Sequence, residues 1–358
     1  MWAMIVKEFR QLRRDRRTLA MMIFLPIVLL VVFGYAASFD VTSIRADVSG
    51  PQAARLAAAL PAPFEVHEVD PAAGREEAVT ALRDGEVPVA FVTSPTGVTI
   101  LLDGSELFIA NAAKASLSSL ADRVPAGVSA RVEVLFNPGL ETSAIMVPGL
   151  AAMILLFVGT VITSLGVVRE RQAGTLEQLA VMPLRPADVF LGKIAPYFVV
   201  SVADLAIIVL AGVWLFGVPF RGSVVVFGLG ALLFMFVTLG IGVLISSVSQ
   251  NQGQAIQLAL MVLLPQIMLS GLIFPLSSMA PGVRWIGYLL PLTYFVRIAR
   301  GVMLRGAPLS ALWPSFLYLG FIGAAVFSLA TLRFRRMLSP ARSHARPMAA
   351  PAVEGAVR

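Results

Sequence analysis

Six separate stretches of this 358-residue chain are apolar enough and long enough to cross a lipid bilayer. A spanning helix needs about 20 residues, because every backbone polar group inside the hydrocarbon must be hydrogen-bonded within the helix. The chain is 58% hydrophobic and only 14% charged, whereas a soluble domain is about half apolar and about a quarter charged. The sequence therefore predicts an α-helical membrane protein with six transmembrane helices. They cover residues 18–38, 145–168, 194–216, 224–246, 255–276 and 313–332.

Charge flanking these stretches predicts their orientation. Residues 7–17 hold six Lys and Arg residues against two acids, and such an excess marks the cytoplasmic side of a span. Residues 1–17 are predicted to form a cytoplasmic helix lying along the membrane surface. An even number of spans returns residues 335–358, a basic and disordered tail, to the cytoplasm. A cleaved signal peptide ending near Ala36 is the alternative, but its apolar run is longer than a usual signal core.

Residues 39–144 form a separate domain on the outer side. They hold 7 Lys and Arg residues against 14 Asp and Glu residues, which gives this segment a net charge of −7. Since the whole chain has a net charge of +7, the remaining residues carry +14. Four runs are rich in Val, Phe and Ile, which is typical of strands, and two runs between them read as helices. The sequence therefore predicts an extracytoplasmic α/β domain. The predicted strands read FEVHEV, VPVAFVTS, GVTILLD and RVEVLF, and the predicted helices cover residues 74–85 and 106–124.

The segment 276–306, before the sixth span, is too interrupted by Pro and Gly for a full span. It reads as short re-entrant helices that dip into the outer leaflet against protein. Its four arginines are an exception to the charge rule, since they fall on the predicted outer side. The alternative, a seventh span here, would place the C-terminus outside. The arginines are Arg284, Arg297, Arg300 and Arg305.

A polar interruption at residues 169–188 separates the second and third spans. Gly174 breaks the helix that leaves the second span, and Thr175 with Gln178 three residues later has the pattern of a capping box. Pro183 ends the short helix that follows. Since this helix lies on the cytoplasmic face and has an apolar side, we expect another protein to dock on it and move the two spans.

The stretch RERQAGTLEQLAVMPLRPADVFLGKIAPY resembles the cytoplasmic segment of the type-2 ABC exporter permeases, also called type V. Other pieces match in the same order, so the resemblance covers most of residues 5–335. They are the start of the chain with its Pro-containing first span, the strand and Asp-Gly turn of the outer domain, the Asn-Pro and Val-Pro-Gly steps before the second span, and the segment before the last span. These pieces lie at residues 7–36, 98–116, 131–155 and 291–306.

This resemblance implies six spans, re-entrant helices after the fifth, a dimer of permeases and ATPase subunits on the cytoplasmic side. It also implies a coupling helix seated in a groove of the ATPase, with the uncharged loop at 250–254 nearby. The residues expected to couple the chain to the ATPase are Glu170, Gly174, Thr175, Leu176, Glu177, Gln178, Leu179 and Pro183.

The chain itself lacks the signature of an ATPase. Its three lysines, Lys7, Lys114 and Lys193, all lie outside any G-x-x-x-x-G-K-[ST] loop, which is the loop that cradles nucleotide phosphates. We therefore expect a non-catalytic subunit without a cofactor, with ATP and Mg²⁺ bound by a partner chain. A metal site is not expected either, because the chain has no cysteine and its two histidines, His67 and His344, are far apart.

One acid, Asp204, lies midway along the third span. A carboxylate at that depth must face protein or water, so it is either a polar site for cargo or protons or a hydrogen-bonding group between helices. The expected function is the permease subunit of an ATP-driven exporter of an amphiphilic cargo, such as a drug, lipid or glycolipid, in the bacterial inner membrane. The expected partners are an ABC ATPase, a second permease, membrane lipids and a possible periplasmic adaptor, but no nucleic acid.

Two other function classes stay open. A secondary transporter is disfavoured because the sequence shows no inverted repeat and only one acid in mid-membrane. A non-transporting membrane protein with a ligand-binding outer domain is compatible with the large domain, but it gives no role to the cytoplasmic interruption.

Overall fold

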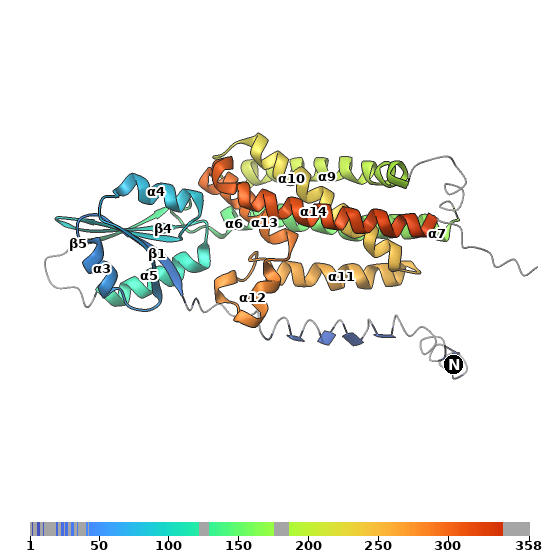
Figure 1. Cartoon of the computed structure of the whole chain (residues 1–358), viewed down its shortest axis with the longest axis horizontal. Helices are drawn as coiled ribbons and strands as arrows, with labels where there is room; N and C mark the ends of the chain where they lie inside the picture. Colours follow the sequence, from blue (N-terminus) through green and yellow to red (C-terminus); the bar gives the residue numbers. More distant parts are fainter. Residues whose placement is uncertain are drawn as a thin grey trace, which may run out of the picture.

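The computed structural model describes residues 43–121, 129–174 and 186–338, together with Val41 and isolated residues between Trp2 and Gly34. Figure 1 shows a β-sheet domain at one end of an elongated helical bundle. The predicted surface helix 1–17 and the predicted first span 18–38 lie mostly outside the described residues.

The sheet domain consists of five strands in the order β2-β1-β3-β4-β5. β1 pairs in parallel with both β2 and β3, β3 and β4 form an antiparallel hairpin, and β4 pairs in parallel with β5. The strands are β1 (Ile44–Ser49), β2 (Phe64–Asp70), β3 (Val89–Ser94), β4 (Gly97–Asp103) and β5 (Ser129–Leu135).

Three helices cover the two faces of this sheet (Figure 1). Ala53 of α3 (Ala53–Ala59) and Leu117 of α5 (Leu107–Ala121) pack with Phe91 and Leu102 on one face. Leu82 of α4 (Arg75–Asp84) packs against Leu101 on the other. Successive residues of β4 therefore belong to opposite faces, as strand geometry requires.

The four predicted strands and two predicted helices of this domain are confirmed. The sequence reading missed β1 and α3. In β1, Ile44, Ala46 and Val48 are buried, but Arg45 and Asp47 alternate with them. Such a short run carries little apolar signal, although it lies inside the sheet between β2 and β3.

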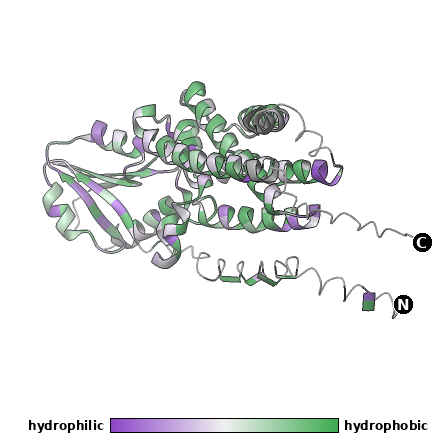
Figure 2. Cartoon of the chain, turned by 45° about the vertical axis from the view of Figure 1, so that its right-hand side comes forward, coloured by the Kyte–Doolittle hydropathy of each residue, from purple (hydrophilic) through white to green (hydrophobic). Residues whose placement is uncertain are grey.

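Long apolar helices form the bundle, and hydrophobic residues dominate them in Figure 2. Five helical stretches are long and apolar enough to cross a membrane: Thr142–Gln172, Ala195–Phe216, Val224–Val248, Gln252–Leu269 and Leu309–Arg333. They correspond to the second to sixth predicted spans. The elements are α6 (Thr142–Phe157), η1 (Val158–Ile162), α7 (Thr163–Gln172), α9 (Pro186–Phe216), α10 (Val224–Val248), α11 (Gln252–Leu269) and α14 (Leu309–Leu338).

The ends of α11 and α14 differ from the prediction. α11 ends at Leu269 instead of residue 276, because Gly271 follows in the left-handed region with φ of 84°. α14 continues to Leu338, so the predicted tail 335–358 begins inside a helix. Residues 339–358 lie outside the described part of the chain.

Short helices fill the segment between α11 and α14. They are η2 (Leu276–Ser278), α12 (Pro281–Gly287), α13 (Pro291–Arg300) and η3 (Gly301–Arg305). Proline occupies the first position of α12 and of α13, where a missing N–H costs nothing. The longest continuous helical run here, 291–305, is shorter than the roughly 20 residues that a span requires. No helix in this segment is therefore long enough to form the alternative seventh span.

The bundle has two distinct ends. α6 begins beside the sheet domain, and the connection from α9 to α10 also lies at this end, since Arg221 N–H bonds the carbonyl of Met303 at 3.0 Å. We call it the domain-proximal end. The opposite, domain-distal end contains Gln172 and Gln252, whose side chains are hydrogen-bonded. The chain enters its described spans beside the sheet domain and leaves α14 at the domain-distal end (Figure 1).

Candidate functional site

The domain-distal end carries the start of the predicted coupling segment. α7 ends at Gln172, and Gly174 follows with φ of 74°. The N–H of Gly174 donates to the carbonyl of Arg171 at 3.1 Å, and the N–H of Ala173 donates to the carbonyl of Arg169 at 3.0 Å. The left-handed region suits glycine because a Cβ is strained there. The helix therefore stops at the glycine where the sequence predicted an interruption.

The uncharged loop between α10 and α11 lies beside this helix end. Gln252 Nε2 donates to Gln172 Oε1 at 3.0 Å. Asn251 caps α11 by accepting from the N–H of Gln254 at 2.9 Å, and Gln254 in turn accepts from the N–H of Gln250 at 2.9 Å. The side chains of the loop thus fix its own backbone, and the loop adds polar but uncharged groups to the domain-distal end.

Of the predicted coupling residues, the structure describes Glu170 and Gly174. Glu170 is half-buried near the end of α7. The role of the set stays a prediction, and the remaining members lie outside the described residues: Thr175, Leu176, Glu177, Gln178, Leu179 and Pro183.

Asp204 lies in the middle of α9 and is half-buried. α9 is the least enclosed of the candidate spans, with 11% of its most apolar stretch buried, against 61% for Thr142–Gln172. Within the described residues no ion pair reaches Asp204. The carboxylate therefore belongs to a helix whose sides are mostly open.

A second polar cluster joins the sheet domain to the bundle, and the sequence reading did not identify it as a site. Asp103 at the end of β4 is 1% exposed, and its Oδ2 lies 3.3 Å from Nη1 of Arg305 at the end of η3. Its Oδ1 accepts from the N–H of Ser105 at 2.8 Å. Burial raises the pKa of Asp103, and the nearby Arg305 guanidinium opposes that rise.

Arg300 forms the second half of this cluster. Its Nη2 donates to the carbonyl of Leu272 at 3.0 Å and its Nη1 to that of Gly271 at 3.4 Å. The Arg300 Nη1 also lies 3.9 Å from Oε2 of Glu106, which precedes α5. We call Asp103, Glu106, Arg300 and Arg305 the charged junction. Two of the four arginines that violated the charge rule thus face acids of the sheet domain.

The other two arginines have local roles. Arg284 Nη2 donates to the carbonyls of Ser277 and Met279 at 2.8 and 3.1 Å. Arg297 lies over the ring of Tyr288, 5.7 Å from its centroid, within the range of a cation–π interaction. The sequence signal for all four was their position on the predicted outer side, but it did not indicate their partners.

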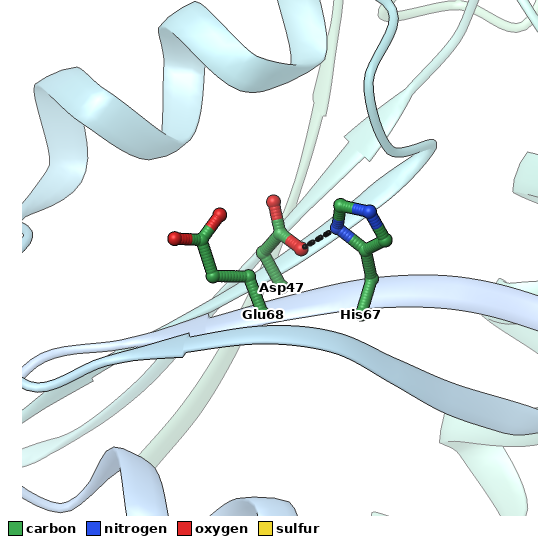
Figure 3. Close-up of side chains that lie close together, drawn as sticks. All are labelled: Asp47, His67 and Glu68. Carbon is green, nitrogen blue, oxygen red and sulfur yellow. Dashed lines mark hydrogen bonds and ion pairs between the residues drawn. The ribbon is translucent and has the colours of Figure 1, made fainter.

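The sheet domain also brings together three side chains able to hold a metal ion (Figure 3). Asp47 comes from β1, and His67 and Glu68 come from β2, where a register shift opposite Asp47 turns both toward it. His67 Nδ1 lies 3.1 Å from Asp47 Oδ1. His67 and Glu68 are exposed, and an exposed acid–histidine hydrogen bond is an ordinary surface feature. The expectation of no metal therefore stays a prediction.

An adjacent hollow of about 440 Å³ is strongly acidic. Asp47 and Glu68 line it, and so do four more carboxylates and small side chains of α4. This hollow concentrates much of the negative charge that the composition assigned to the domain. The four further carboxylates are those of Asp70, Glu76, Glu77 and Glu86.

The span-length apolar helices and the separate sheet domain define a multi-pass membrane protein. Residues 16–332 match the family model described as ABC-2 family transporter protein, and the chain belongs to that family. The resemblance inferred from the sequence motifs is thereby confirmed.

Several named relatives are similar to this chain. The probable multidrug ABC transporter permease YbhS of Escherichia coli (strain K12) is 29% identical over 370 residues, covering 94% of this chain and 97% of the relative. The probable multidrug ABC transporter permease YbhR of the same strain is 28% identical over 363 residues, covering 94% and 98%. The inner membrane transport permease YhhJ is 37% identical over 214 residues, covering 59% and 57%. These relatives support a membrane permease subunit of an ABC transporter.

Proposed function

We propose that this chain is the permease half of an ATP-driven exporter that moves an amphiphilic cargo outward across the bacterial inner membrane. The observation that carries the proposal is the domain-distal end. There the helix leading to the predicted coupling segment ends at Gly174, and the uncharged loop of Gln252 lies beside it. A soluble ATPase docked at this end would contact both α7 and α11 at once.

The proposed topology places the sheet domain outside the cell and both chain ends in the cytoplasm. Six spans, including 18–38, and a re-entrant segment 276–306 complete it. The basic run 7–17 and the net charge of +14 outside residues 39–144 support this orientation. The exit of α14 at the end opposite the sheet domain agrees with it.

In the proposed mechanism, the residues from Thr175 to Pro183 form the coupling helix, and Glu170 and Gly174 at the end of α7 connect it to the second span. Closure of two ATPase subunits around ATP and Mg²⁺ pushes on this helix in each permease. Because it lies between α7 and α9, the push tilts these two spans and opens a path between the paired permeases. The chain contributes the path and the lever, and the partner contributes the hydrolysis.

The proposed partners are an ABC ATPase, a second permease as a homodimer or with a sibling chain, membrane lipids and a possible periplasmic adaptor. Two of the relatives carry names that specify multidrug transport. A drug, a lipid or a glycolipid would suit a path lined by apolar spans. Asp204 would supply a polar contact for such a cargo within α9.

The test is an affinity pulldown of the tagged full chain, solubilised from its native membrane. Wild type is compared with Glu177→Arg, which reverses a charge in the coupling segment. The matched control is Glu76→Arg, which makes the same reversal on the exposed surface of α4 at the other end of the molecule. We expect an ATPase without membrane spans to co-purify with wild type and the control and to be lost or weakened with Glu177→Arg.

If no ATPase accompanies any of the three proteins, the exporter proposal is wrong at its centre. The secondary transporter and the ligand-binding membrane protein then become the leading candidates. If Glu76→Arg weakens the association as much as Glu177→Arg, the ATPase does not dock through the coupling segment.

A further inference from the structure

The charged junction links parts of the chain that are distant in sequence. Asp103 and Arg305 are 202 residues apart, yet their side chains form an ion pair of 3.3 Å. The Arg305 side chain is only 10% exposed and that of Asp103 only 1%. A buried pair of this kind is costly to separate, because each partner would be left as an uncompensated charge away from water.

The Arg305 side chain is inserted into the sheet domain. Gly85, the left-handed cap of α4, lies so close that an added Cβ would be 2.7 Å from Arg305 Nη1 and 2.9 Å from Nη2. The guanidinium thus fits between the end of α4 and the end of β4. Glycine at position 85 serves two needs, since φ is 78° there and a side chain would collide with the arginine.

Arg300 extends the same attachment to another helix. Its guanidinium holds the carbonyls of Gly271 and Leu272, directly after α11, while it faces Glu106 at the start of α5. Within the α13–η3 segment, Arg300 therefore bonds the end of α11, and both Arg300 and Arg305 face acids of the sheet domain. The covalent link from β5 to α6 lies close by, where Asn137 Nδ2 donates to the carbonyl of Gly104 at 3.3 Å.

We propose that Arg300 and Arg305 are positioning residues that fix the sheet domain on the α13–η3 segment, so that domain and segment move as one rigid body during transport. The domain then follows the helices and does not swing on its link to α6. Motion of this body during transport rests on the proposed function, whereas the rigid attachment rests on the charged junction alone. The resulting role of the domain is to carry motion of the α13–η3 segment outward beyond the bundle.

Pulsed electron paramagnetic resonance on the full chain in lipid nanodiscs measures this attachment directly. The chain has no cysteine, so Glu76→Cys on α4 and Ser310→Cys at the start of α14 give two unique spin-label sites, both exposed. The distance distribution between the labels is recorded without nucleotide and, with the ATPase bound, in a vanadate-trapped state. We expect one narrow distribution with the same mean in both states.

Variants of the junction then separate positioning from simple packing. Asp103→Asn and Arg305→Gln each leave one buried charge unpaired, and we expect them to broaden the distribution. Arg305→Lys keeps the charge, and Asp103→Asn combined with Arg305→Gln removes both charges; both should recover part of the narrow distribution. The control is Arg75→Gln, which removes the exposed 2.8 Å ion pair to Glu133 in the same domain and should leave the distribution unchanged.

A wild-type distribution that is broad, or whose mean shifts between the two states, overturns the proposal. So does a narrow distribution in both single variants. A single variant that fails to give a monodisperse protein is replaced by Arg305→Lys and the double variant, which leave no unpaired charge. Because the nucleotide-free measurement needs no ATPase, failure of the exporter proposal would leave this test of the attachment intact.

Discussion

Gln252 at the start of α11 donates a hydrogen bond of 3.0 Å to Gln172 at the end of α7. The bond crosses the domain-distal end and is exposed to water. It contrasts with the neighbouring Gln254, which is 1% exposed and whose Oε1 accepts from the N–H of Gln250 at 2.9 Å. Two glutamines two positions apart thus serve different purposes, one joining two helices at the surface and one fixing the loop from within.

Substituting these glutamines should therefore give unequal effects. We expect Gln252→Ala to lower the free energy of unfolding by at most about 1 kcal/mol, since an exposed neutral hydrogen bond contributes little net stability. Gln254→Ala should cost more, about 1–3 kcal/mol, because it empties the buried site of the Gln254 side chain and removes the acceptor of the part-buried hydrogen bond from the Gln250 N–H. Thermal unfolding followed by tryptophan fluorescence measures both. Equal losses would show that the loop is not held by Gln254.

Substituting Gly174 should lower the free energy of unfolding because of its backbone conformation alone. An added Cβ there meets no atom within 4 Å, but φ is 74°. We expect Gly174→Ala to cost about 1–2 kcal/mol, the usual penalty for a side chain in the left-handed region. Gly228 in α10 is equally open and is helical, so Gly228→Ala should stabilise by roughly 0.5–1 kcal/mol. Similar melting temperatures for the two variants would mean that the turn after α7 is not left-handed.

Leu102 should be a strong stability determinant of the sheet domain. Its side chain is fully buried between β3, β5 and the helices on that face. Leu102→Ala should lower stability by about 2–5 kcal/mol through lost contacts and the cavity left behind. The loss should appear as faster hydrogen exchange in peptides of β3 and β4. Val132→Ala on β5, where the valine is 41% exposed, serves as control and should change exchange little.

Arg305→Gln should make stability depend on pH. Burial already raises the pKa of Asp103, Glu106 raises it further, and Arg305 opposes them. Without Arg305 the folded-state pKa rises further above the unfolded value of about 3.9. An acid with a raised folded-state pKa loses stability as pH rises between these two values. We therefore expect the destabilisation by Arg305→Gln to be smaller at pH 5 than at pH 8.

Melting temperatures of wild type and Arg305→Gln, measured at both pH values, check this expectation. Arg75→Gln is again the comparison. Arg75 holds the pKa of Glu133 below its usual range through a hydrogen bond on the exposed surface, so its loss should affect stability only slightly. A pH-independent loss in Arg305→Gln would indicate that Asp103 stays charged without its partner.

Local requirements explain what the sequence predicted well. The second to sixth spans were recognised because each must be apolar over its own length to lie in lipid. The strands β2 to β5 were recognised from runs of Val, Phe and Ile. In contrast, η1 reads VGTVI and interrupts the span Thr142–Gln172 without a charged residue or proline to mark it, so no pattern in the sequence indicated a π-helical turn there.

The charged junction was unpredictable for a different reason. Asp103 lies in a short Asp-Gly turn and Arg305 in a basic helix end, and each motif is unremarkable by itself. Their partnership is set by the tertiary fold, which brings the end of β4 against the end of η3. The one signal in the sequence was the position of the four arginines, which fall on the predicted outer side together with the acidic domain. Positive charge on that side is unexpected, and it indicated that some other group compensates it.

The unequal enclosure of the spans has a consequence for how the sequence can vary. Within Thr142–Gln172, where 61% of the most apolar stretch is buried, a substitution must match the shape of its neighbours. Along α9, where only 11% of the most apolar stretch is buried, a new side chain contacts mainly the lipid or protein outside the chain and has to fit only that. Lipid tails accept an apolar side chain of any size, whereas a second protein does not. A saturation scan of α9 would therefore record what covers this helix: even tolerance to size where lipid lies, and a stripe of intolerance where another protein does.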